Sequence, residues 1–149
     1  MIVSKESFLG EFWIKGDIPS HPRPRFNRHS GRVYLPQKYM DWKKDSVIQL
    51  QPQWKKEPID GCIAISLSIV HTRPQSRFRK SNQDFRIPKI TGGDLDNEIK
   101  SVLDVLVDAQ ILTDDRIIWE IRAQRFWSAK DDPAHCWIQI SEKTSQWKQ

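Results

Sequence analysis

The chain of 149 residues predicts one domain of the α/β class, of α+β type, in which a mixed sheet is packed by two main helices. Two patterns support this prediction. Apolar residues alternate with polar or small ones in several short segments, as in strands, and recur every three or four positions in two longer segments, as in helices. The length suffices for one hydrophobic core, so we expect residues 1–149 to form a single unit.

The clearest strand pattern covers residues 63–70. Ile63, Ile65 and Leu67 alternate with small residues, and the run is apolar enough for the centre of a sheet. Shorter alternating patterns predict strands over residues 11–16, 33–35, 117–124 and 136–140. The two ends of the chain, residues 1–10 and 143–149, are expected to be loose.

Two helices are predicted. The first runs from Pro36 to Leu50, because proline is well tolerated in a first helical turn and Pro52 marks the end. The second runs from Leu95 to about Ala109, with an apolar stripe that would pack on the sheet. That stripe consists of Leu95, Ile99, Val102, Leu103 and Leu106.

Basic residues are concentrated in two segments. The chain has 24 Lys and Arg against 19 Asp and Glu, and its isoelectric point near 9.3 favours nucleic acid over a membrane surface as a partner. One segment is a proline-rich loop over residues 18–32, and the other, over residues 72–93, is expected to be a basic mobile loop, although a merely solvated loop remains the alternative. The residues expected to bind DNA phosphates are Arg23, Arg25, Arg28, Arg32, Arg73, Arg77, Arg79, Lys80, Arg86 and Lys89.

Acidic residues gather between residues 94 and 120, which hold eight acids and only two bases, a local charge of 2 − 8 = −6. Asp94 precedes the second helix, Asp96 lies in its first turn, and Lys100 follows Asp96 by four residues on the same helical edge. Asp115 shares strand parity with Ile117, so we expect it to turn toward this helix. Three converging carboxylates would require a hard divalent cation, for which Mg²⁺ is the natural candidate, with Mn²⁺ as a substitute.

Each part of this acidic cluster also has a simpler explanation. Asp94 or Asp96 before an apolar helix is often an N-cap, and Asp96 with Lys100 is an ordinary pair on a helix surface. Asp114 and Asp115 before a strand are often just a turn. The residues alone leave both interpretations open.

The remaining composition favours a cytoplasmic protein without a small-molecule cofactor. No apolar run approaches the ~20 residues that cross a membrane, and the first residues do not form a signal-peptide pattern. Cys62 and Cys136 lie in apolar runs, so we expect both to be buried, reduced thiols. The four histidines have no zinc-ligand spacing, and we expect no catalytic role for them.

Two motifs of the chain resemble those of the RusA family of Holliday-junction resolvases, small endonucleases that cut four-way DNA junctions. The first is Asp94-Leu95-Asp96-Asn97 with Lys100, then Asp104 in a Val-Leu-Asp-Val-Leu run and the pair Asp114-Asp115. The second is Gly16-Asp17-Ile18-Pro19 and Pro22-Arg23-Pro24-Arg25-Phe26, leading into Gly31-Arg32-Val33-Tyr34-Leu35-Pro36. Together they cover roughly residues 11 to 126 in family order.

This resemblance implies a RusA-like fold, Mg²⁺ dependence, a homodimer and paired incisions across the junction. The family's metal-binding acids carry over to Asp94, Asp96 and Asp115, and its essential lysine carries over to Lys100; Asp104 is either a further site residue or a polar residue of the helix. One feature departs from the family. Basic residues often precede its first acid, whereas here that place is Thr91-Gly92-Gly93.

The leading hypothesis is therefore a Mg²⁺-dependent endodeoxyribonuclease that resolves Holliday junctions in DNA recombination and repair. Its catalytic residues would be Asp94, Asp96, Lys100 and Asp115. One alternative is a catalytically inactive protein of the same fold that only binds branched DNA. Another is a nuclease that acts on flaps, replication forks or RNA.

Overall fold

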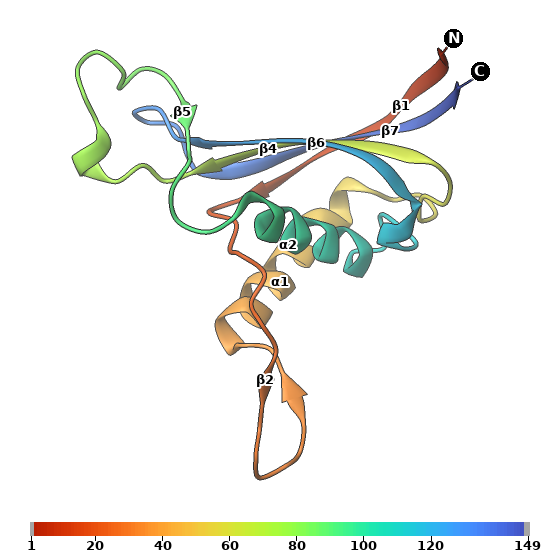
Figure 1. Cartoon of the computed structure of the whole chain (residues 1–149), viewed down its shortest axis with the longest axis horizontal. Helices are drawn as coiled ribbons and strands as arrows, with labels where there is room; N and C mark the ends of the chain where they lie inside the picture. The colour runs from red at the N-terminus through yellow and green to blue at the C-terminus, as the bar shows by residue number, and fades with distance from the viewer. Residues whose placement is uncertain (1, 148–149) are drawn as a thin grey trace.

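A mixed sheet of five strands organises the protein, whose computed structural model describes residues 2–147 (Figure 1). In spatial order the strands are β1 (Ile2–Lys15), β7 (His135–Trp147), β4 (Ile63–His71), β6 (Ile118–Trp127) and β5 (Ile87–Pro88). Strands β4 and β6 are parallel, and the other neighbours are antiparallel. The predicted α+β domain is confirmed, with β4 in the middle of the sheet as expected.

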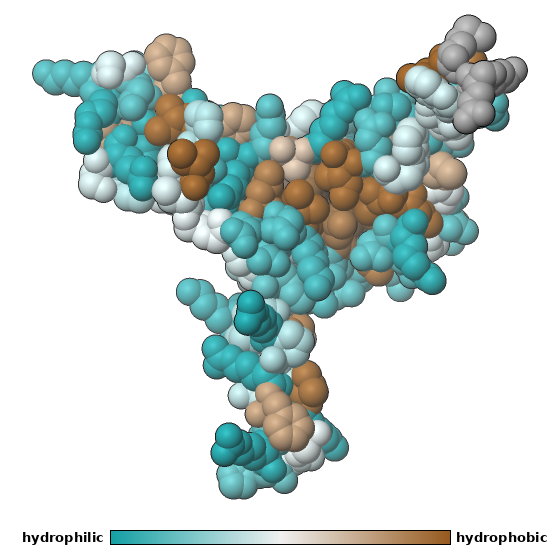
Figure 2. Space-filling view, viewed as in Figure 1, coloured by the Kyte–Doolittle hydropathy of each residue, from teal (hydrophilic) through white to brown (hydrophobic). Residues whose placement is uncertain are grey.

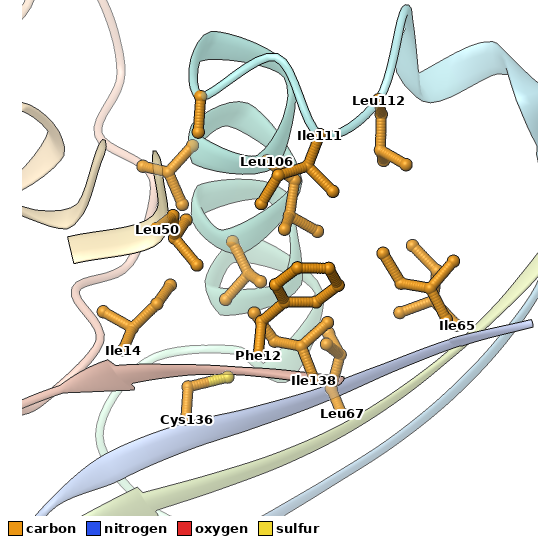
Figure 3. Packing of buried hydrophobic residues seen from close by; sticks show 14 of the residues in the cluster. Phe12, Ile14, Leu50, Ile65, Leu67, Leu106, Ile111, Leu112, Cys136 and Ile138 are labelled. Carbon is orange, nitrogen blue, oxygen red and sulfur yellow. The ribbon is translucent and has the colours of Figure 1, made fainter. Parts of the chain in front are cut away.

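Two helices, α1 (Gln37–Leu50) and α2 (Leu95–Asp108), lie together on one face of the sheet (Figure 1). Phe12 and Ile138 from the sheet meet Leu50 of α1 and Leu106 of α2, all almost completely buried (Figure 3). Burying each such side chain stabilises the fold by roughly 1.5–3 kcal/mol. No helix among residues 2–147 is long and apolar enough to cross a membrane.

The ends of the chain form strands, contrary to the expectation of loose termini. Strand β1 begins at Ile2, and β7 continues to Trp147, which pairs with Ile2 across an antiparallel ribbon. Each of the two terminal segments is too polar to predict a strand by itself. They form strands because they pair with each other, although they lie at opposite ends of the sequence. Residues 1, 148 and 149 of the predicted loose ends lie outside the described residues.

The buried face of α2 is rotated from the predicted apolar stripe. Val102 and Leu106 are buried as expected, but Leu95, Ile99 and Leu103 are only half-buried. The polar residues Glu98 and Ser101 are buried instead, at 1% and 0% exposure. The helix therefore carries a charged residue into the interior near its first turn.

An arm projects from the body of the protein and consists of the two-stranded hairpin of β2 (Arg25–Phe26) and β3 (Val33–Tyr34), below the helices in Figures 1 and 2. Its side chains, apolar ones included, are exposed. The second basic segment contains a short 3₁₀ helix (Gln75–Arg77) and strand β5. Within this segment, the buried side chain of Arg73 donates to the carbonyl oxygens of Asn82 and Phe85, and the Arg73 backbone N–H donates to Ser128 Oγ outside the segment.

Candidate active site

The two acids of the first motif stand exposed at the N-terminus of α2. Asp94 has extended backbone angles and occupies the N-cap position, and its carbonyl oxygen accepts the Glu98 backbone N–H at 3.3 Å. Its side chain, however, makes no capping hydrogen bond to the described residues. Asp96 lies in the first turn, where the helix dipole favours negative charge. Helix capping therefore does not account for the Asp94 carboxylate.

Lys100 lies one turn beyond Asp96 and is exposed. The ordinary ion pair of the simpler explanation is not formed, because among residues 2–147 the Lys100 ammonium lies within 4.0 Å of no carboxylate. Asp94 and Asp96 are likewise without ion-pair partners in the part of the chain that the structure describes. Two carboxylates and an ammonium group thus lie near one helix end without neutralising partners.

Asp115 lies at the opposite end of α2, and its predicted orientation toward Asp94 and Asp96 is wrong. A helix of 14 residues is about 21 Å long at 1.5 Å per residue, and Asp115 follows its C-terminus. Strand parity did not apply because residues Asp115–Ile117 form a 3₁₀ turn and β6 starts only at Ile118.

The neighbouring Asp114 is a turn residue, as the simpler explanation proposed. Its carboxylate accepts the backbone N–H of Arg116 at 2.8 Å and the Arg116 guanidinium at 3.1 Å. These hydrogen bonds from Arg116, the backbone one foremost, lower the pKa of Asp114. Asp115 makes no ion pair with any described residue, and its side chain is exposed.

One chain does not gather the three predicted metal ligands. Between Ile2 and Trp147 there is no group of three or more His, Cys, Asp or Glu side chains arranged to hold a metal ion. Two carboxylates can still bind Mg²⁺, because this ion is often held by one or two carboxylates together with water and phosphate oxygens. Asp94 and Asp96 offer such oxygen ligands. The pair therefore fits part of a divalent-cation site.

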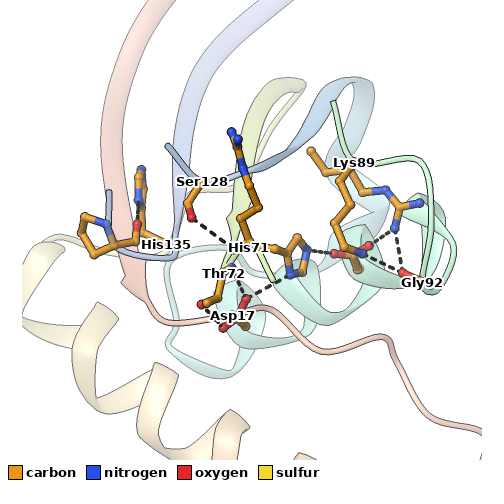
Figure 4. A network of polar contacts seen from close by, with 11 residues as sticks. Asp17, His71, Thr72, Lys89, Gly92, Ser128 and His135 are labelled. Carbon is orange, nitrogen blue, oxygen red and sulfur yellow. Dashed lines mark hydrogen bonds and ion pairs between the residues drawn. The ribbon is translucent and has the colours of Figure 1, made fainter. Parts of the chain in front are cut away.

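A buried polar network beneath these acids was missed by the sequence prediction. The Glu98 carboxylate binds His71 Nε2 of β4 through one oxygen and Arg125 Nη1 of β6 through the other, the latter at 2.5 Å (Figure 4). On the far side of the ring, His71 Nδ1 lies 3.4 Å from an oxygen of Asp17. Lys89 extends the network by donating to the Gly92 carbonyl oxygen at 2.7 Å. We call Asp17, His71, Lys89, Glu98 and Arg125 the Glu98 network.

The Glu98 carboxylate is held in its charged form. Burial by itself raises its pKa, but the hydrogen bond and charge of His71, the hydrogen bond from Arg125 and the charge of Lys89 outweigh burial, so the pKa is lower than usual. The pKa of Lys89 is also lowered, mainly by burial and further by Arg125, although Glu98 opposes the shift. The charges of the network therefore compensate one another inside the protein.

The ten predicted DNA-binding residues divide into exposed and buried sets. Arg73 and Lys89 are only 3% and 8% exposed, and both hold backbone carbonyl groups of their own segment, so neither side chain is presented to a DNA phosphate. Arg86 is exposed but pairs with Asp132 at 2.7 Å. The remaining members are exposed: Arg23, Arg25, Arg28 and Arg32 on or beside the arm, and Arg77, Arg79 and Lys80 in the second basic segment.

The exposed basic segments of this small α+β domain are the electrostatic features of a protein that binds nucleic acid. A family model described as "Endodeoxyribonuclease RusA" matches residues 16–148, and the chain belongs to this family. A similar protein is the "Crossover junction endodeoxyribonuclease RusA" of Aquifex aeolicus (strain VF5), 27% identical over 104 residues, which cover 67% of this chain and 70% of that protein.

Proposed function

We propose that the protein is a Mg²⁺-dependent, structure-selective endodeoxyribonuclease that resolves Holliday junctions by paired phosphodiester hydrolysis in DNA recombination and repair. The observation that carries this proposal is the exposed, unpaired group of Asp94, Asp96 and Lys100 in a member of the RusA family. The name of the Aquifex aeolicus relative, a crossover junction enzyme, supports the choice of substrate.

The chain's own groups have distinct roles in this proposal. Asp94 and Asp96 would hold the divalent cation, which when bound would acidify a water molecule and stabilise charge on the scissile phosphate. Lys100 would place its ammonium group beside the phosphate and favour the charge that develops during cleavage. The exposed arginines of the arm and the second basic segment would bind phosphates, with affinity that falls as salt rises and little dependence on sequence.

The third carboxylate would come from a second copy of the chain. A homodimer with its two-fold axis across the middle of α2 would set the two helices antiparallel, so that Asp115 of each copy approaches Asp94 and Asp96 of the other. Three carboxylates could then form one site, although Asp115 and the pair Asp94 and Asp96 lie at opposite ends of α2 within one chain. Two composite sites related by a two-fold axis also suit a substrate that must be cut on two strands.

An apolar surface along α2 supports this arrangement. The half-buried Leu95, Ile99 and Leu103 line one side of the helix, and Ile121 of β6, which is in register with the buried Ile65 of β4, is 40% exposed. Figure 2 shows a hydrophobic patch on the face of the body beside α2. Apolar surface of this kind is typical of an interface between copies.

Two other functions remain as alternatives for the same fold. A protein that only binds branched DNA has no need of unpaired carboxylates close to phosphates, so the exposed pair Asp94 and Asp96 argues against it. A nuclease for flaps or forks would use the same acids, and only the choice of substrate in an assay separates it from a resolvase.

The proposal is tested with a synthetic four-way junction, a fork and a linear duplex, each incubated with Mg²⁺, with Mn²⁺ or with chelator. We expect symmetric nicks on the junction that need the metal. Asp96→Asn should abolish cleavage while junction binding in chelator persists, because the variant removes a cation ligand and no phosphate contact. Binding without cleavage under both metals would establish the inactive binder, and preferential cleavage of the fork would establish the other nuclease.

A further inference from the structure

The buried network around Glu98 converges on the backbone immediately before Asp94. Lys89 Nζ donates to the Gly92 carbonyl oxygen at 2.7 Å, and Arg125 Nη1 donates to the same oxygen at 3.3 Å (Figure 4). Two cationic side chains thus hold one carbonyl group two residues before Asp94. Hydrogen bonds from charged donors are the stronger ones, so this peptide group is fixed with respect to the sheet.

The same network holds the helix that follows Asp94. Glu98 closes the first turn by donating its backbone N–H to the Asp94 carbonyl oxygen. Its carboxylate is bound on one side by His71 at the end of β4 and on the other by Arg125 of β6. Since β4 and β6 are adjacent parallel strands, the first turn of α2 is attached to two strands of the sheet at once.

The backbone between these two attachments has little freedom to vary. Gly92 and Gly93 have φ angles of +72° and +74°, a region that residues with a side chain rarely adopt. A Cβ atom on Gly93 would also lie 2.6 Å from Ser20 Oγ of the neighbouring loop. The family often has basic residues directly before its first acid. In this chain the same position holds Thr91-Gly92-Gly93, which form a tight turn that leads into Asp94.

Stability alone does not explain why these charges are buried. Removing ionised groups from water is costly, and well-packed apolar residues often serve stability equally well or better. Buried groups that surround and orient the ligands of a metal ion, by contrast, commonly determine the ion's affinity. The network holds the Gly92 carbonyl group before Asp94 and the first turn of α2 after it. Residues that orient a metal ligand need contacts placed in this way.

We propose that the Glu98 network is a positioning device that sets where the Asp94 and Asp96 carboxylates lie for binding a divalent cation. The inference rests on the proposed function, because it assumes that these two acids are the cation ligands. Glu98 touches neither DNA nor the cation in this scheme. It acts through the Gly92 carbonyl group, by way of Arg125, and through the first turn of α2.

The test compares the wild-type protein with Glu98→Gln, which keeps the size of the side chain but removes its negative charge. Mn²⁺ binding is measured by titration calorimetry, and the metal dependence of junction cleavage is measured beside it. We expect affinity for Mn²⁺ to fall by about 10- to 100-fold. Cleavage should recover in part at high Mn²⁺, while junction binding in chelator stays unchanged. An unchanged Mn²⁺ affinity in the folded variant would overturn the inference.

Two further variants make the outcome specific. Glu120→Gln is the matched control, because the Glu120 carboxylate also has two cationic partners, Arg122 and Lys143, but lies on β6 away from Asp94 and Asp96. It should leave Mn²⁺ affinity unchanged. If Glu98→Gln does not fold, Lys89→Met decides, since it keeps an unbranched side chain but removes the ammonium group that donates to Gly92 and lies 5.0 Å from the centre of the Trp127 ring.

The failure of the inference can be told apart from the failure of the proposed function. If the wild-type protein neither binds Mn²⁺ nor cleaves any branched DNA, the proposed function is wrong. If the wild-type protein binds Mn²⁺ and cleaves, but the folded Glu98→Gln protein has the same Mn²⁺ affinity, only the positioning role is wrong; where Glu98→Gln does not fold, the same holds for Lys89→Met.

Discussion

Cys62 and Cys136 have opposite surroundings, although both lie in apolar runs of the sequence. Both are free thiols, but Cys62 is exposed just before β4, whereas Cys136 is completely buried in β7. Burial raises the pKa of the Cys136 thiol to about 12, because the thiolate is disfavoured away from water. The expectation of two buried thiols is therefore wrong for Cys62.

This difference predicts the alkylation behaviour of the protein. At pH 8 only about one Cys136 thiol in 10⁴ would be ionised, and the reagent cannot reach it in the folded state. We expect one iodoacetamide adduct in native buffer, at Cys62, and two adducts after unfolding in guanidinium. Peptide mass spectrometry identifies the labelled residue, and rapid native labelling of Cys136 would contradict the assigned burial.

Glu98 shows which single-residue properties a sequence conceals. A glutamate in a basic protein is expected at the surface, and its partners His71 and Arg125 are each 27 residues away along the chain. One signal was available, because position 98 lies four residues before Val102 and eight before Leu106, on the buried face of the helix. Only the fold reveals that compensating charges meet it there.

Asp104 connects helix α2 to α1 and to the loop after β1. Its carboxylate accepts the Tyr39 hydroxyl at 3.0 Å and lies 2.9 Å from His21 Nε2. Burial, the charge of Asp104 and its hydrogen bond together raise the pKa of Tyr39. The contacts favour a structural role for Asp104 over the open possibility that it belongs to the site.

Asp104→Ala should therefore lower stability and spare catalysis. The substitution leaves the buried Tyr39 hydroxyl without its acceptor, which costs roughly 1–3 kcal/mol in the free energy of unfolding. Urea denaturation measures the loss. The control is Lys43→Ala, which breaks the more exposed Lys43–Asp108 pair between the same helices and should cost less than about 1 kcal/mol. A folded Asp104→Ala protein that cannot cleave would instead place Asp104 in the site.

The elements that could be predicted are those whose signal is local. The alternation of apolar and small residues located β4. The helical spacing of apolar residues, with proline and aspartate at the helix ends, located α1 and α2 almost to the residue. The elements that could not be predicted depend on distant pairing, as in the ribbon of Ile2 with Trp147. The predicted orientation of Asp115 was wrong for a related reason. It assumed that the strand begins at Asp115, whereas residues Asp115–Ile117 form a short 3₁₀ turn.

The molecule as a whole sets the limit on what one chain can do. Helix α2 presents Asp94, Asp96 and Lys100 at one end and Asp115 at the other, and its rigidity prevents them from meeting within one copy. A pair of antiparallel copies would create two complete sites from four incomplete ends. Light scattering should accordingly report a dimer at micromolar concentration.

Mixed dimers of two inactive variants test this arrangement directly. Asp96→Asn and Asp115→Asn chains, each inactive alone, are co-expressed with different tags, and the heterodimer is isolated. If Asp115 acts on the partner's acids, one of the two sites in the heterodimer contains both substitutions and the other contains none, so single-strand nicking of the junction returns. If Asp115 acts within its own chain, both sites carry one substitution and no nicking returns. The matched control is the heterodimer of Asp94→Asn with Asp96→Asn, which places a substitution in each site under either arrangement and should stay inactive.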